Sequence, residues 1–305
     1  MEHAVSTGTR IEADLLTLSA GTSHHAAGTS HRAITQRILR LADQAGYKAA
    51  LIDATEGTVT AWPRFARTVR VAADGLSRRG LAAGDAAGVF VQDAASFAVA
   101  VNAIRAAGAI AWPIRPEASM ADVAAQLNAC GARVLVTAAP LAETAAEAAD
   151  RSRVRQVFAF GEAPGTTPFR SLLGLAKHSA DNYGADNYGA DNYGADGCGT
   201  HDGGGTPDEP GRETGDRPPD QDDGTALPPG LALSHRDVVV AGPPCGEGHA
   251  YTALLDLTLL AGATIVAAPV PLIAAAMRVY KGTAAIVPRD TQVPGLRLDR
   301  VFAVA

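Results

Sequence analysis

The stretch GTALPPGLALSH, at residues 224–235, has the residue types that come nearest to a binding chemistry. Turns rich in Gly, Thr and Pro can bind phosphate by pointing backbone N–H groups at its oxygens, especially where a helix begins. We expect a helix to begin at Ser234 and His235, and its N-terminus would carry about half a positive charge. The candidate phosphate-binding residues are therefore Gly224, Thr225, Gly230 and Ser234.

Several features of the same stretch oppose the binding of a triphosphate. It contains no Lys or Arg, and Pro228 and Pro229 have no N–H to donate. Asp220, Asp222 and Asp223 precede it in sequence, within a Debye length of about 8–10 Å. Each lost donor at a site of developing charge typically lowers the rate about 10²–10³-fold, so we expect little catalysis from this loop.

Metal and disulfide chemistry find little support in the sequence. Cys130, Cys198 and Cys245 are odd in number and have no CxxC spacing, which indicates neither a disulfide framework nor a zinc site and fits a reduced cytosol. Four histidines lie within the first 32 residues, but a tail without regular structure offers a metal no fixed geometry. We therefore assign no metal ligand among them: His3, His24, His25 and His31.

Composition and charge indicate a soluble, cytoplasmic protein. The chain of 305 residues is 47% hydrophobic and 19% charged, and its net charge is −6. Lys and Arg are scattered along it, which argues against a nucleic-acid surface. The N-terminus has no signal-peptide pattern, and the most apolar run, at residues 262–277, is interrupted by Pro269 and Pro271, so we expect no membrane span.

Alternating helical and strand patterns predict an α/β fold with largely parallel sheets and packed helices. The periodicity of apolar residues and the placement of Gly and Pro give the element boundaries. The expected helices cover residues 33–46, 63–80, 95–108, 120–131 and 141–150, and the expected strands cover residues 49–53, 87–91, 109–114, 133–137 and 154–160.

We divide the chain into four parts. Residues 1–32 form a flexible arm, 33–178 a first α/β lobe, 179–223 an acidic linker and 224–305 an incomplete second α/β lobe. The linker carries the ADNYG repeats and a net charge of −10 over residues 180–224, and we expect it to be a long disordered insert.

Two other interpretations of the repeats fit less well. In a pentapeptide β-helix, asparagine would take the inward position, so that the coil would have no core. The aspartates could bind calcium, but their spacing matches neither the EF-hand nor the calcium-binding nonapeptide repeat.

Three stretches of the first lobe resemble the AMP-forming adenylating superfamily, which includes acyl- and aryl-CoA synthetases, luciferases and the adenylation domains of peptide synthetases. They are VTAWPRFARTVRVAADGLSRRGLAAGDAAGVFV, FAVAVNAIRAAGAIAWPIRP and VAAQLNACGARVLVT. After the linker the resemblance resumes with GTALPPGLALSHRDVVVAG and LLDLTLLAGATIVAAP. It implies the first lobe and part of the second lobe of the acyl-CoA synthetase N-terminal domain.

The resemblance also shows where this sequence departs from the family. The family's phosphate loop reads approximately SSGTTGLPKGVMLSH, and its Lys falls on Pro229. The His of the family's acyl pocket falls on Glu247, with His249 nearby as a substitute, so these two residues are the candidate substrate contacts. Binding of ATP, magnesium and CoA is implied by the resemblance alone. The family's later magnesium, ribose and catalytic Lys segments have no counterpart before Ala305, so we assign no catalytic residue.

These observations favour a truncated acyl-CoA-synthetase-like protein, catalytically incompetent alone, that acts as a binding or scaffold partner. Its expected partner is a protein that covers the incomplete second lobe, or a second copy in a homo-oligomer. The enzymatic alternative is one part of a split AMP-forming carboxylate–CoA ligase completed by a partner chain. A third interpretation is a poorly folded relic.

Overall fold

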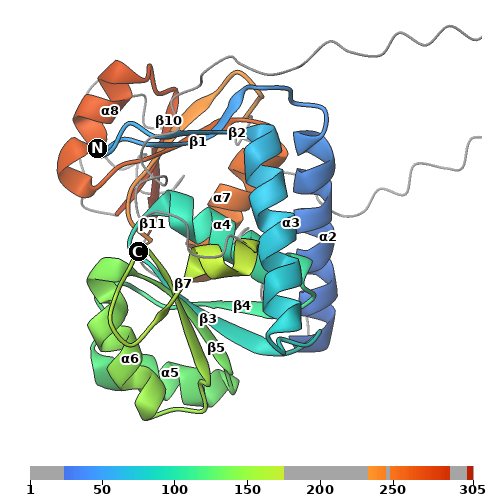
Figure 1. The fold of residues 1–305 in the computed structure, drawn as a ribbon. Helices are drawn as coiled ribbons and strands as arrows, with labels where there is room; N and C mark the ends of the chain where they lie inside the picture. The colour runs from blue at the N-terminus through green and yellow to red at the C-terminus, as the bar shows by residue number, and fades with distance from the viewer. Residues whose placement is uncertain (1–23, 175–232, 245–247, 289–300, 305) are drawn as a thin grey trace, which may run out of the picture. The chain divides into compact units, whose positions relative to one another are not determined.

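The computed structural model describes residues 24–174, 233–244, 248–288 and 301–304 of the chain (Figure 1). They form a mixed α/β fold with two sheets, as the sequence predicts. Of the expected flexible arm at 1–32, the part up to residue 23 lies outside the described residues. The expected acidic linker at 179–223 lies outside them as well.

One sheet is built from a contiguous part of the chain, and we call it the contiguous sheet. Its five strands run parallel in the order β4-β3-β5-β6-β7. The strands are β3 (Ala86–Phe90), β4 (Ile110–Pro113), β5 (Val134–Ala138), β6 (Gln156–Phe160) and β7 (Thr167–Pro168). The connecting helices are α4 (Ala94–Ala106), α5 (Met120–Cys130) and α6 (Ala142–Asp150).

Local signals explain where these helices begin and end. Asp93 caps α4 by accepting a hydrogen bond from the N–H of Ser96 at 2.7 Å, and Ser119 caps α5 through the N–H of Asp122. Gly131 adopts the left-handed conformation that stops α5. The predicted strands and helices of this region are confirmed to within one or two residues.

The other sheet combines strands from both ends of the sequence, and we call it the assembled sheet. Its order is β11-β10-β8-β9-β1-β2. The strands are β1 (Ala49–Asp53), β2 (Val59–Ala61), β8 (Val238–Ala241), β9 (Thr264–Ala267), β10 (Ala284–Pro288) and β11 (Val301–Val304). All neighbours are parallel except β1 and β2, which form an antiparallel hairpin.

The pairing of β1 with β9 corrects the expected division of the fold. Leu51 pairs with Ile265, so a strand from the predicted first lobe lies next to β9, inside the sheet assigned to the second lobe. The linker therefore does not separate the strands of this sheet from those of the first lobe. Residues 49–61 belong with residues 238–304, because β1 satisfies its backbone groups against β9 on one side and β2 on the other.

The first described helix also differs from expectation. Helix α2 (His24–Ala42) begins within the segment predicted to be an arm, whereas the apolar periodicity starts only at Ile34. Its contacts with α4 and α7 (Gly248–Leu260) explain the difference, because tertiary packing stabilises turns that local sequence does not favour. His31 thus lies on a helix and not in a tail.

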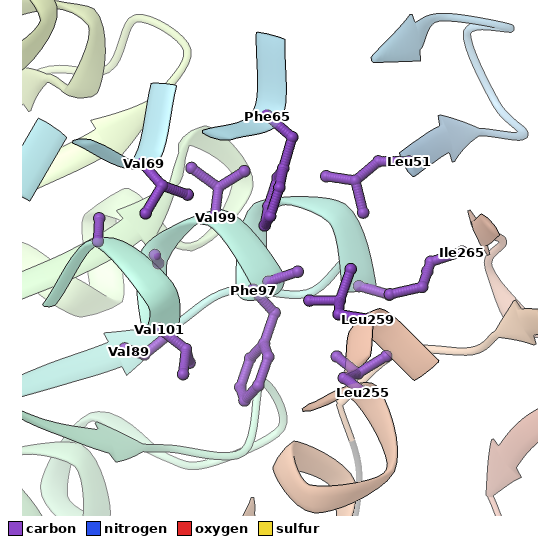
Figure 2. Packing of buried hydrophobic residues seen from close by; sticks show 14 of the residues in the cluster. Leu51, Phe65, Val69, Val89, Phe97, Val99, Val101, Leu255, Leu259 and Ile265 are labelled. Carbon is purple, nitrogen blue, oxygen red and sulfur yellow. The ribbon is translucent and has the colours of Figure 1, made fainter. Parts of the chain in front are cut away.

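One hydrophobic core joins the two sheets. It includes side chains from α3 (Trp62–Arg78), α4 and α7, together with both sheets. Figure 2 shows Phe65 and Phe97 between the contiguous sheet and the residues Leu51 and Ile265 of the assembled sheet. Burial of each such side chain contributes about 1.5–3 kcal/mol, so the two sheets stabilise each other.

The opposite face of the assembled sheet is covered by the short helix α8 (Ile273–Val279). A 3₁₀ turn, η3 (Val270–Leu272), leads into this helix, and another, η2 (Phe169–Leu173), packs against α3. A third, η1 (Ala139–Leu141), follows β5.

Candidate functional site

The end of the glycine- and proline-rich stretch forms a turn that leads into β8, and not the expected helix. Asp237 accepts hydrogen bonds from the backbone N–H of Ser234 at 2.7 Å and from its hydroxyl at 2.9 Å. The N–H of Asp237 donates back to the carbonyl of Ser234 at 3.0 Å, which closes the turn. The chain then enters β8 at Val238, so Ser234 has no helix N-terminus to offer an anion.

Asp237 also ties this turn to the neighbouring strand. The residue is 8% exposed, and its second carboxylate oxygen accepts a hydrogen bond from the hydroxyl of Thr283 at 2.8 Å. The Thr283 oxygen in turn accepts from the N–H of Val238 at 3.0 Å. The buried carboxylate is therefore part of the junction between β8 and β10, and it accepts hydrogen bonds from both the N–H and the hydroxyl of Ser234.

A cation lies beside the same turn but makes bonds of its own. The ammonium group of Lys48, just before β1, donates to the carbonyl oxygens of His235 and Gly262, the latter at 2.6 Å. Burial lowers the pKa of Lys48, and the negative charge of Asp237 opposes this effect. Lys48 thus links β1 to the turns before β8 and β9 and is not directed at a free anion.

The other predicted phosphate-binding residues, Gly224, Thr225 and Gly230, lie outside the described residues, as does Glu247. His249 is described and lies in the first turn of α7, exposed to solvent. Its ring meets the ring of Trp112 in β4 edge to face, with centroids 6.4 Å apart. The structure therefore places Ser234 in a strand junction and His249 against an aromatic side chain.

A buried ion pair that the sequence analysis missed lies between α4 and α7. Arg105 donates to Asp256 at 2.7 Å, and the two side chains are 5% and 8% exposed. Burial raises the pKa of the Asp256 carboxyl, and Arg105 lowers it part of the way back. The available signal was a charged residue within each of two apolar stretches, NAIRA and LLDLT, because such charges are rarely buried without a partner.

His31 of α2 completes this cluster. Its Nδ1 atom lies 3.3 Å from the guanidinium of Arg105. Burial, followed by the charges of Arg105 and His249, lowers the pKa of His31 to about 4. The imidazole is therefore neutral at neutral pH and accepts a hydrogen bond from Arg105.

The described residues contain no group of three or more His, Cys, Asp or Glu side chains that could hold a metal ion. Within the same residues, no helix combines the length and apolar character needed to cross a membrane.

Comparison with known proteins agrees with this fold. Residues 39–187 match the family model described as AMP-binding enzyme. No curated protein matches the chain by sequence. The N-terminal part of the chain is thus similar to AMP-binding enzymes, and the solved structures extend this likeness to the assembled sheet.

Three solved structures illustrate the likeness. A long-chain-fatty-acid-CoA ligase from Archaeoglobus fulgidus superposes with a TM-score of 0.59 at 19% identity, covering 85% of this chain and 51% of the ligase. A benzoate CoA ligase from Burkholderia xenovorans gives 0.59 at 18% identity, with 84% and 50% covered. The N-terminal domain of FACL13 from Mycobacterium tuberculosis gives 0.57 at 15% identity, with 87% and 68% covered.

The fold is therefore that of the N-terminal part of acyl- and aryl-CoA ligases. The chain spans about half the length of the first two ligases.

Proposed function

We propose that this acyl-CoA-ligase-like chain does not activate a carboxylate with ATP by itself and acts by binding another protein. One observation carries the first half of this proposal. The N–H and the hydroxyl of Ser234, which would serve a phosphate oxygen, are both bonded to the buried carboxylate of Asp237. A triphosphate would have to displace this internal anion and would meet its charge.

The sequence around the loop supports the same conclusion. The family's loop Lys is replaced by Pro229, and Asp222 and Asp223 add negative charge just before it. We expect the chain to bind Mg-ATP with a Kd near 1 mM or weaker, which corresponds to about −4 kcal/mol.

Calorimetry with Mg-ATP tests the binding, and pyrophosphate release with a mixed pool of fatty and aromatic acids tests the chemistry. Two changes separate the contributions: a restored loop, with Pro229→Lys, Ala226→Gly, Asp222→Ser and Asp223→Gly, and the substitution Asp237→Asn. The restored loop should improve ATP binding slightly, Asp237→Asn should add to it, and neither should release pyrophosphate. The matched control replaces Pro229 by Gln in place of Lys and should lack most of the gain.

A micromolar Kd for ATP in the unmodified chain, or pyrophosphate release above background, would contradict the proposal. Either result would favour the alternative of one part of a split AMP-forming carboxylate–CoA ligase. The match of residues 39–187 to AMP-binding enzymes supports that alternative. The split-ligase alternative further requires that a second chain, which supplies the rest of the ligase fold, restores acyl-adenylate formation.

Exposed apolar side chains beside the assembled sheet support the binding role. Val270 and Leu272 on η3 and Val279 at the end of α8 are 42%, 37% and 70% exposed. We place the contact with a protein partner, or with a second copy, on this surface. Sizing chromatography should show assembly that Val279→Lys weakens, and a clean monomer at micromolar concentration would count against self-association.

A further inference from the structure

A short row of buried polar side chains lies between α2 and α4. Thr35 on α2 donates from its hydroxyl to the side-chain oxygen of Asn102 on α4 at 2.8 Å. Asn102 donates to the carbonyl of Ala98 at 2.9 Å, and both Thr35 and Asn102 are at most 1% exposed. One turn earlier on α2, His31 meets Arg105, which lies one turn later on α4.

The partners of His31 require its neutral form. A guanidinium only donates hydrogen bonds and keeps its charge at every accessible pH. The Nδ1 atom of His31 must therefore accept from Arg105, with the ring proton on Nε2. A proton added to Nδ1 would remove this bond and place a second positive charge beside a guanidinium whose carboxylate partner, Asp256, is already bound.

We propose that His31, Arg105 and Asp256 form an acid-sensitive latch: protonation of His31 separates its ring from Arg105 and releases residues 24–34 of α2, while Thr35 and Asn102 hold the remainder. The contact between Thr35 and Asn102 has no titratable group, so α2 should stay bound from Thr35 onwards. The latch acts on the contact of α2 with α4 and α7 and leaves the two sheets intact.

The charged groups around His31 come from three elements. Arg105 of α4 and His249 of α7 both disfavour its protonation, and Arg32 neighbours it on α2 itself. Asp256 of α7 acts in the opposite direction. Burial raises the pKa of the Asp256 carboxyl, so this carboxyl binds a proton more readily in the folded chain than in the unfolded chain. Acid therefore favours the folded state at Asp256.

The sign and range of the effect follow from the lowered pKa of His31. The released helix has the ordinary histidine pKa of 6.5, and the latched state has a pKa of about 4. The latch is therefore fully effective above pH 6.5 and weakens as the pH falls towards 4. At pH 5.0 the release equilibrium should be about 30-fold more favourable than at pH 7.5.

Hydrogen exchange with mass spectrometry, corrected for the intrinsic pH dependence of exchange, tests the latch in the full chain. Amides of residues 24–34 should lose protection about 30-fold between pH 7.5 and pH 5.0, whereas amides of residues 35–42 should not change. The variant His31→Asn keeps an acceptor oxygen near the position of Nδ1 but cannot be protonated, so its protection should be independent of pH. The control His249→Gln removes the smallest of the three influences on the His31 pKa and should retain most of the response.

The outcomes separate the proposal from general acid sensitivity. Loss of protection in His31→Asn as well as in the unmodified chain, or in neither, would overturn the latch. If His31→Asn fails to fold, an NMR titration of the His31 ring in the unmodified chain decides. A pKa below 5 supports the latch, and a value of 6 or higher contradicts it.

Discussion

The two sheets are made from similar strands but from the chain in different ways. The contiguous sheet takes every strand from residues 86–168, with a helix between most neighbours. The assembled sheet takes β1 and β2 from residues 49–61 and its other strands from residues 238–304. Strands that are close in sequence therefore suffice to build the contiguous sheet, whereas the assembled sheet depends on contacts between distant segments.

The contacts between distant segments also differ in kind from the local ones. Arg105 and Asp256 are 151 positions apart, and Lys48 reaches a carbonyl 214 positions away. Within the contiguous sheet, the positions of helices and turns follow from nearby residues such as Asp93, Ser119 and Gly131. We therefore expect the join between the regions to be the most sensitive to substitution.

The largest effect should follow from breaking the buried ion pair. Asp256→Ala leaves the Arg105 charge buried without its carboxylate, which should lower the free energy of unfolding by about 3–5 kcal/mol. Denaturant unfolding of the unmodified chain and the variant measures this change. The double variant Arg105→Met with Asp256→Leu should recover most of the loss, because it removes both charges and keeps the volume.

A loss of less than 1 kcal/mol in Asp256→Ala would show that the pair contributes little to the join. Asp43→Ala provides the comparison at the surface. It breaks the pair of Asp43 with Arg70, whose side chains are 55% and 46% exposed, and should leave the free energy of unfolding nearly unchanged because solvent screens exposed charges.

The next largest effects should be changes in the folding and unfolding rates, which differ between the two sheets. Leu135→Ala in β5 and Ile265→Ala in β9 both remove fully buried side chains, and each should cost about 2–5 kcal/mol. Because contacts between nearby residues form at a lower entropy cost, we expect the contiguous sheet to form first. Leu135→Ala should then mainly slow folding, and Ile265→Ala should mainly accelerate unfolding. Stopped-flow measurements that find the reverse would show that the assembled sheet leads.

The smallest effects on stability should come from replacing two glycines that other residues contact closely. A Cβ on Gly75 of α3 would overlap the backbone of Leu172 in η2, whereas one on Gly282 would overlap the flexible end of Met277. Gly75→Ala should therefore destabilise the chain by about 1–3 kcal/mol, and Gly282→Ala by less than about 1 kcal/mol. Thermal unfolding measures both, and equal costs would mean that η2 moves as readily as Met277.

Much of the fold was predictable because its signals are local. The strand at Ala49–Asp53, the helix with Pro63 in its first turn and the stop of α5 at Gly131 all follow from residue type and spacing. The partner of β1 was not predictable, because any buried parallel strand can pair with another and the linker in between suggests separate lobes. The extra turns of α2 were missed because they depend on contacts with α4 and α7.

The candidate site was less predictable than the fold. Ser234 has an acidic residue three positions later, a spacing shared by helix caps and by turns, and the structure shows the turn. His249 was expected near a substrate, and the structure places its ring against Trp112 and its charge near His31. The cluster of His31, Arg105 and Asp256 joins three helices, so no single stretch of sequence contains its pattern.

The pairing of β1 with β9 has a consequence during synthesis of the protein on the ribosome. Lys48 and the Gly262 carbonyl that it binds are 214 positions apart. The strand β1 follows Lys48 and the strand β9 follows Gly262, so β1 cannot pair with β9 until more than 200 further residues have been made. At about 5–20 residues per second, β1 and β2 leave the ribosome about 10–40 s before β9 has been made. During that interval the inner edge of β1 is an unpaired strand edge on a nascent chain, and a chaperone that shields such edges would find its target there.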